Sequence, residues 1–430
     1  MRSRRHGTSL QLTTHSLSSR KCLPFASPVL HNQHPRVVAR FPTISTSARQ
    51  SSIHPKPIIA QTKPLRATVY TGIAAPPVNM ARFRNVDLMR QADAFPYPGE
   101  TETPFSTTVD TTRLVTLLHR NADGTDQTIG LLLPQVVEAL IEVPEEIRGP
   151  VMYDAPARTL RAFEQPTEPE RSATVAAVMQ RWREQKTFAL LSGWRDELWP
   201  VYATSDPKAP EVLYSVERAA AGLLGVMRYG VHMTGYVRSS PTTNNDDNNN
   251  NNDNDNENLK IWVPRRAVDK STYPSMLDNT VAGGLMTGED PFDCMVREAD
   301  EEASLPEALM REKCKPTGMV TYIYITDERA GGEKGLIYPE TQWVYDLELP
   351  ADVVPTPQDG EVAEFYLWTV PEVQEALARG EFKPNCALIL LDFFVRKGIL
   401  TKENETHYDE IVRRLHREVP FPGPHQAAAA

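Results

Sequence analysis

The sequence predicts an α/β (α+β) fold in which a mixed β-sheet is sandwiched between helices and is preceded by a smaller α/β domain. Three observations predict this fold. Residues 292–303 repeat apolar side chains at helical spacing. Strand-like runs lie on both sides of that helix. Residues 88–228 carry their own helix and strand patterns, and a chain of 430 residues with 40% hydrophobic content can form two or three cored domains.

The first 86 residues differ sharply in charge from the rest. No Asp or Glu precedes Asp87, whereas 13 of the 46 Lys and Arg residues lie there, among many Ser and Thr. This composition is typical of an organelle transit peptide, so we expect a disordered extension and mitochondrial localisation. Two alternatives are a basic tail without a specific role in a cytoplasmic protein, and translation that starts at Met80.

The remaining 33 basic residues face all 56 acidic residues, so residues 87–430 have a net charge of −23. This acidic body argues against binding to a nucleic acid polymer. No apolar run reaches about 18 residues, so no membrane span is expected. Four cysteines without paired metal spacing indicate a reducing compartment. Nothing in the sequence specifies an oligomeric state.

Residues 87–228 form the expected N-terminal α/β domain. We expect helices over 172–184 and 215–224, the second capped by Ser215 and ended by Gly225, and strands over 188–192, 198–203 and 226–237. Between the first two strands, Trp194, Arg195 and Glu197 could place an aromatic face and charges over a substrate ring. The alternative is a turn aromatic that packs on its own domain beside a surface ion pair.

The second domain is expected over residues 229–424. Every residue from Asn244 to Asn258 is Asn, Asp or Glu, which predicts a disordered insertion, over 241–258, in a surface loop between two strands. After the 292–303 helix, strands are expected over 319–326, 336–347 and 361–368, and helices over 371–378, 387–396 and 408–418.

The residues with the clearest chemistry lie in the segment 283–305. Glu298, Glu301 and Glu302 fall at i, i+3 and i+4, so a helix places them on one face. Carboxylates held that close repel one another and are suited to a divalent cation such as Mg²⁺ or Mn²⁺. Asp290 can serve as N-cap, with Pro291 at the first helical position. We expect Gly283 and Gly284, with Gly288, to form a tight loop that brings backbone N–H groups near a phosphate.

This segment resembles the Nudix box, the sequence motif of the Nudix hydrolases. The family pattern is matched at eight positions, and Ser304 stands where the pattern has Gly; the matching residues are Gly283, Glu289, Arg297, Glu298, Ala299, Glu301, Glu302 and Leu305. The resemblance implies metal-assisted attack of water on a diphosphate, with Glu298, Glu301 and Glu302 as ligands. Arg297 is expected to point away from the metal and to pair with Glu289. Glu361 is the candidate for an extra ligand or a water-orienting base, and a solvent-exposed strand-end acid is the alternative.

Motifs outside the box resemble the thiamine-diphosphate-related Nudix proteins of fungi and plants, a branch that some fungi fuse to a thiamine pyrophosphokinase domain. They cover about residues 85–424 and include Gly193–Glu197, Tyr229–His232, Gly360–Val362, Phe365–Trp368, Phe382–Ala387 and Leu391–Phe394. The resemblance implies a metabolite-repair hydrolase that converts thiamine diphosphate, or its oxidised analogues, to the monophosphate and phosphate. One alternative is a nucleotide-pool hydrolase such as an 8-oxo-dGDP phosphatase. A second is a non-enzymatic ligand-binding module, which would be expected to lose box acids, and none is lost.

Overall fold

The computed structural model describes residues 82–100, 109–203, 210–238 and 258–428. Every described residue belongs to the unit that spans Ala75–Ala430. The expectations for a disordered transit peptide and for the Asn/Asp-rich insertion fall on residues 1–81 and 239–257, which lie outside the described residues. In the described part of the chain, no helix is both long enough and apolar enough to cross a bilayer.

The larger sheet has six strands and is mixed, as the sequence predicts. Its order is β10-β11-β7-β8-β12, and the short β9 pairs with β7 beside this path. Strand β11 runs parallel to β7, and the other pairs are antiparallel. The strands are β7 (Arg228–Arg238), β8 (Leu259–Arg266), β9 (Val281–Gly284), β10 (Lys315–Ile325), β11 (Ile337–Glu348) and β12 (Val362–Thr369).

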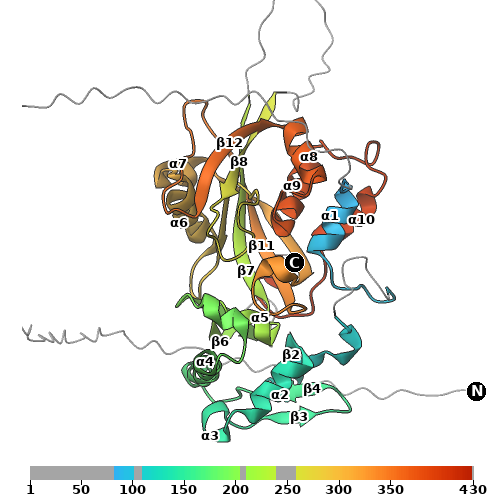
Figure 1. Cartoon of the computed structure of the whole chain (residues 1–430), viewed down its shortest axis with the longest axis vertical. Helices are drawn as coiled ribbons and strands as arrows, with labels where there is room; N and C mark the ends of the chain where they lie inside the picture. Colours follow the sequence, from blue (N-terminus) through green and yellow to red (C-terminus); the bar gives the residue numbers. More distant parts are fainter. Residues whose placement is uncertain (1–81, 101–108, 204–209, 239–257, 429–430) are drawn as a thin grey trace, which may run out of the picture. The chain divides into compact units, whose positions relative to one another are not determined.

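Helices cover both faces of this sheet. Figure 1 shows α6 and α7 on one side and α8, α9, α1 and α10 on the other. Side chains of α6 share one core with β7, and those of α9 share a second core with β8 and β10. The helices are α1 (Asn85–Ala92), α6 (Pro291–Ala303), α7 (Glu307–Lys313), α8 (Val370–Ala378), α9 (Pro384–Arg396), α10 (Tyr408–Leu415) and α11 (Pro424–Ala428), with the 3₁₀ turn η3 (Glu328–Ala330).

The preceding domain contains two smaller sheets. One has the strand order β2-β1-β4-β3, and the other pairs β5 with β6. Its strands are β1 (Val115–Arg120), β2 (Asp126–Leu132), β3 (Met152–Asp154), β4 (Thr159–Arg161), β5 (Leu198–Ala203) and β6 (Glu211–Glu217). Its helices are α2 (Pro134–Glu142), α3 (Glu145–Arg148), α4 (Glu168–Gln185) and α5 (Ala221–Leu224), with the 3₁₀ turns η1 (Thr111–Arg113) and η2 (Ala189–Gly193). A single hydrophobic cluster runs from Leu117 through Val175 to Val231 and Met295, so this domain is fused to the larger sheet through a shared core.

Two local predictions in this domain are wrong, and tertiary contacts explain both. The strand predicted over 188–192 is absent, and residues 189–193 form the turn η2, because the N–H groups of Ala189 and Leu190 donate to the Glu333 carboxylate at 2.5 and 3.1 Å. Ser215 does not cap a helix. It lies inside β6, opposite Pro200 of β5, and the helix shrinks to α5, which ends at the left-handed Gly225.

The boundary expected at residue 87 also changes. Helix α1 packs on α9 and α10, and its buried Val86 and Met89 belong to the core of the larger sheet. Asp93, which directly follows α1, is fully buried. It accepts hydrogen bonds from Arg417 Nε at 2.6 Å and from the Ile323 N–H at 3.0 Å. Residues 82–95 therefore belong to the domain of the larger sheet, although the 132 residues of 96–227 separate them from its first long strand, β7.

We predict that Asp93→Ala lowers the free energy of unfolding by about 3–5 kcal/mol, because it leaves the buried Arg414 and Arg417 without their shared anion. Denaturant titration of the full-length protein measures this change. Asp409→Ala, at an exposed carboxylate paired with Lys402, is the matched control and should change the free energy by less than about 1 kcal/mol. Equal effects of the two substitutions would contradict the role assigned to α1.

Candidate active site

Helix α6 forms where the local signals predict it. The Asp290 side chain caps it by accepting from the N–H groups of Phe292 and Asp293, and Pro291 occupies the first turn. The predicted apolar stripe is buried at Met295, Val296, Ala299 and Ala303, and Phe292 is partly buried. The helix ends at Ser304, which adopts the left-handed conformation (φ 53°). That conformation favours glycine, which explains why the family pattern has Gly at this position.

Arg297 lies at the centre of the box acids. It donates to Glu289 at 2.8 and 3.2 Å, as expected, and this pair connects the loop before α6 to the helix. It also donates to Glu298 at 2.9 Å and to Glu301 at 3.0 Å. The expectation that Arg297 points away from the metal-binding acids is therefore wrong in this structure, because its guanidinium is the nearest compensating charge for them.

Glu298 and Glu302 point from α6 toward strand β9. Glu302 accepts a hydrogen bond from the Ala282 N–H at 2.9 Å and forms no salt bridge with any described residue. Burial raises the pKa of Glu302 well above its usual range, and the charges of Glu298 and Asp278 raise it further. Burial also raises the pKa of Glu298 to about 7, although Arg297 opposes this shift. The positive charge around these two carboxylates is too small to keep their pKa values in the usual range.

Gly283 and Gly284 do not form a phosphate loop. They are strand residues of β9, paired with Val231 and Gly230 of β7. A Cβ at Gly283 would lie 2.1 Å from Cγ of Glu298, and one at Gly284 would lie 2.7 Å from the Trp199 ring. Glycine is needed here because side chains approach the strand closely on both sides. Of the expected loop glycines, only Gly288 has a positive φ, at 83°.

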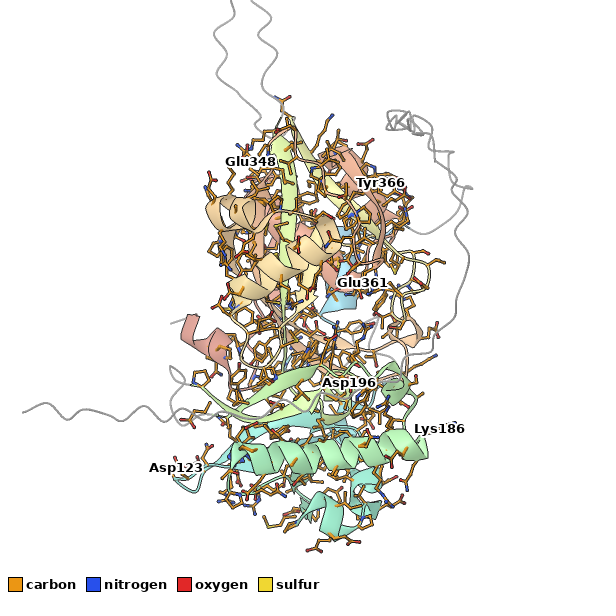
Figure 2. The ribbon with its side chains drawn as sticks, turned by 90° about the vertical axis from the view of Figure 1, so that its left-hand side faces the viewer. Asp123, Lys186, Asp196, Glu348, Glu361 and Tyr366 are labelled. Atoms are coloured by element: carbon orange, nitrogen blue, oxygen red, sulfur yellow. The ribbon has the colours of Figure 1, made fainter. Side chains whose placement is uncertain are left out.

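Glu361 directly precedes β12, at the end of the strand that faces the preceding domain (Figure 2). Tyr366 lies farther along β12, away from that domain (Figure 2). Glu361 forms an ion pair with Lys270. Burial would raise the pKa of Glu361, but the hydrogen bond and charge of Lys270 outweigh it and hold the pKa below its usual range. The charge of Glu361 is close enough to Glu302 to raise its pKa. Glu361 therefore remains a candidate additional ligand or base.

The donor set fits a hard divalent cation. Glu298, Glu301 and Glu302 supply oxygen ligands, and a bound cation would offset the repulsion between the two inner acids, Glu298 and Glu302. Among the described residues, no three His, Cys, Asp or Glu side chains already converge as a metal site. In this structure Glu298 and Glu301 are instead paired with Arg297.

A cavity of about 280 Å³ lies between the larger sheet and the preceding domain. Ala282, Gly283 and Gly284 form part of its wall, so the cavity reaches the strand on which Glu298 and Glu302 pack. The preceding domain contributes residues of η2, β5 and the segment after β6. The charged, aromatic and polar side chains that line it include Arg195, Trp199, Arg218, Arg228, Tyr322 and Gln342.

The three substrate residues suggested by the sequence fall in different places. Arg195 lines the cavity and donates to Ser271 Oγ at 3.2 Å. Trp194 does not line it. Its indole donates to Asp196 at 2.8 Å and packs beneath Arg183, so the structure favours the alternative of a turn aromatic on its own domain. Glu197 pairs with Arg218 at 2.7 Å.

Sequence reasoning missed Trp199, Arg218 and Arg228. Trp199 lies in a strand that was predicted correctly, but only tertiary packing shows that its ring reaches β9. Both guanidinium groups stack on that ring, with centroid distances of 5.2 Å for Arg218 and 4.8 Å for Arg228. No local pattern in the sequence marks these two arginines.

Strands β10 and β11 contribute a buried polar cluster to the cavity wall. Glu340 pairs with Arg228 at 3.0 Å and accepts a hydrogen bond from the Tyr322 hydroxyl. Gln342 donates to both Glu340 and Tyr322, at 3.0 and 3.2 Å. Its carbonyl oxygen is buried without a hydrogen-bond partner. Such an acceptor is costly unless a ligand or water donates to it.

The fold and the box helix together define a Nudix-type hydrolase, and comparison with known proteins agrees. The NUDIX domain family matches residues 251–386, and a domain of unknown function, DUF4743, matches residues 125–228. The chain is 36% identical over 304 residues to the uncharacterized protein YJR142W of Saccharomyces cerevisiae, and the match covers 70% of this chain and 83% of the yeast protein. The chain belongs to the Nudix hydrolase family.

Two plant proteins named as Nudix hydrolases are also similar. The chain is 35% identical over 250 residues to Nudix hydrolase 20, chloroplastic, of Arabidopsis thaliana, and 33% identical over 247 residues to Nudix hydrolase 24, chloroplastic, of the same species. The matches cover 58% and 57% of this chain and 59% of each plant protein, so less than two thirds of either relative is spanned.

We predict that Glu298→Gln and Glu302→Gln each remove most turnover while the fold stays intact. Each substitution removes one negative ligand and keeps the side-chain shape. Glu302→Gln should also raise the melting temperature of the metal-free protein, since it removes the repulsion from Glu298 and Asp278. Steady-state kinetics at limiting Mg²⁺ and thermal melts measure both effects. Turnover near the wild-type rate in both variants would overturn the assignment of the acids.

Proposed function

We propose that this Nudix hydrolase cleaves the diphosphate of a small heteroaromatic diphosphate, first of all thiamine diphosphate or its oxidised analogues, to give the monophosphate and phosphate. The observation that carries the proposal is the cavity itself. Its lining includes Gly283 and Gly284, the β9 residues against which Glu298 and Trp199 pack, and Gln342, whose buried carbonyl oxygen has no partner. Its volume of about 280 Å³ suits a small molecule and not a polymer.

The chemistry of the buried polar cluster supports a ring that carries an amino group. The Gln342 carbonyl oxygen can accept from such a group, and the rings of Tyr229 and Tyr338 line the same cavity. The aminopyrimidine of thiamine has this chemistry, and the thiamine-related resemblance of the flanking motifs makes it our first choice. An 8-oxopurine nucleoside diphosphate also presents an exocyclic amino group, so 8-oxo-dGDP is the second candidate.

The box residues support the reaction by holding charge and position. Glu298, Glu301 and Glu302 would hold Mg²⁺ or Mn²⁺, which supplies a water of lowered pKa and neutralises charge at phosphorus. Arg297 fixes the loop before α6 through Glu289, so the acids keep their place when substrate enters. Water attacks one phosphorus and the other phosphate leaves, which consumes one water and releases the monophosphate and phosphate.

We predict that the full-length protein with Mg²⁺ releases phosphate from oxidised thiamine diphosphates with a higher kcat/KM than from 8-oxo-dGDP or GDP. Colorimetric phosphate release, with chromatography of the monophosphate, measures this order. Turnover restricted to the nucleotides would establish the second candidate instead. If none of these compounds is cleaved, the proposal of a small heteroaromatic diphosphate is wrong.

A variant in the buried polar cluster provides the control. Gln342→Met keeps the side-chain length and removes the amide, both the free acceptor and the donor to Glu340 and Tyr322, so it should raise KM for the amino-bearing substrates about tenfold and change kcat little. Hydrolysis of inorganic pyrophosphate, which has no ring, should change much less. An equal change on both kinds of substrate would show that Gln342 acts through the fold.

A further inference from the structure

We propose that the domain of unknown function that precedes the hydrolase domain completes the active site, and that its Trp199 and Arg218 bind the diphosphate group of the substrate. The inference rests on the proposed function only for the diphosphate chemistry and does not depend on which ring the substrate carries. It assigns a role to residues 125–228, for which the family comparison gives none.

The first observation is an unpartnered donor beside the strand that borders the box acids. Trp199 is 6% exposed, and its indole Nε1 is buried without a hydrogen-bond partner. The ring edge that carries Nε1 packs against Gly284, where an added Cβ would lie 3.5 Å from Nε1 and 2.7 Å from Cζ2. A buried donor in this position has a cost unless an acceptor enters the cavity beside it.

The second observation is the excess of positive charge around that donor. Arg195, Arg218 and Arg228 all line the same cavity, and two of them stack on Trp199. Arg228 Nε is a second buried donor without a partner. The charge of Arg218 also lowers the pKa of both Glu298 and Glu361, so this cavity residue lies within electrostatic reach of both carboxylates. An anion that occupied this wall would meet cations and N–H donors together, which is the arrangement that binds phosphate.

The third observation concerns the partner of Arg218. Its guanidinium is held by Glu197 of the same domain at 2.7 Å, and both side chains are about one third exposed. An exposed pair of this kind stabilises a fold by only about 0–1 kcal/mol, so it is a weak reason for the arginine to be there. A diphosphate can instead replace Glu197 as the partner of Arg218, because it carries more negative charge than one carboxylate.

The test uses imidodiphosphate, a diphosphate that cannot be hydrolysed and has no ring, with the full-length protein and Mg²⁺. Isothermal titration calorimetry measures its dissociation constant in five proteins: the wild type, Trp199→Phe, Arg218→Gln, Glu197→Gln and Arg183→Gln. Trp199→Phe keeps an aromatic ring and loses the N–H. Arg183→Gln removes a guanidinium that stacks on Trp194 outside the cavity, so it is the matched control.

We expect Trp199→Phe and Arg218→Gln to weaken binding by about 10- to 100-fold, and Arg183→Gln to leave it unchanged. Glu197→Gln should leave binding unchanged or tighten it, since it frees Arg218. If the Glu197–Arg218 pair is only structural, the two variants at this pair should lower the melting temperature alike and leave affinity for the probe unchanged, which overturns the proposal. A wild-type protein that does not bind the probe at millimolar concentration also overturns it.

If Arg218→Gln does not fold, Arg218→Lys keeps the charge and loses the planar fork, and it should show a smaller loss of affinity. Because the probe has no ring, these results are independent of the substrate screen. Weakened binding in the two cavity variants, together with failure to cleave thiamine diphosphates, would reject the proposed substrate and retain the diphosphate-binding wall.

Discussion

The close packing of helix α6 on the short strand β9 is the constraint on which the site depends. At each of three consecutive residues of β9, one side chain from another element reaches the backbone of the strand. The Ala282 N–H binds Glu302, Gly283 makes room for Glu298, and Gly284 makes room for Trp199. One strand therefore holds the acids on one side and the cavity wall on the other. Larger side chains at the two glycines would separate both layers.

This arrangement explains why the preceding domain shares a core with the hydrolase domain. Trp199 can reach Gly284 only if β5 is fixed against the larger sheet, and the hydrophobic cluster that joins the two parts fixes it. The same packing buries Arg228 between Trp199 and Tyr338, at 4.8 and 4.1 Å from their ring centroids, where it pairs with Glu340. The cavity is therefore built from both domains, and its polar and cationic walls meet at Arg228.

Local signals were enough to predict the box helix and much of the sheet. Asp290, Pro291 and the apolar spacing of 292–303 determine α6, and residues 198–203 were predicted to the residue as β5. The failures are at places where a distant partner decides the structure. The carboxylate of Glu333 turns residues 189–193 into a 3₁₀ helix, and pairing with Pro200 keeps Ser215 in a strand. Arg297 was expected to turn away from the acids because spacing alone cannot show which carboxylates a long side chain reaches.

The packing of α6 on β9 can be tested most directly by the dissociation constant of Mn²⁺ in Gly283→Ala protein, measured by electron paramagnetic resonance. The added methyl group must displace Glu298, so metal affinity should fall by about 10-fold or more. Gly193→Ala, where an added Cβ meets no atom within 4 Å, is the control and should bind Mn²⁺ as the wild type does. Unchanged Mn²⁺ affinity in a folded Gly283→Ala protein would contradict the central claim that Glu298, held over Gly283, is a metal ligand.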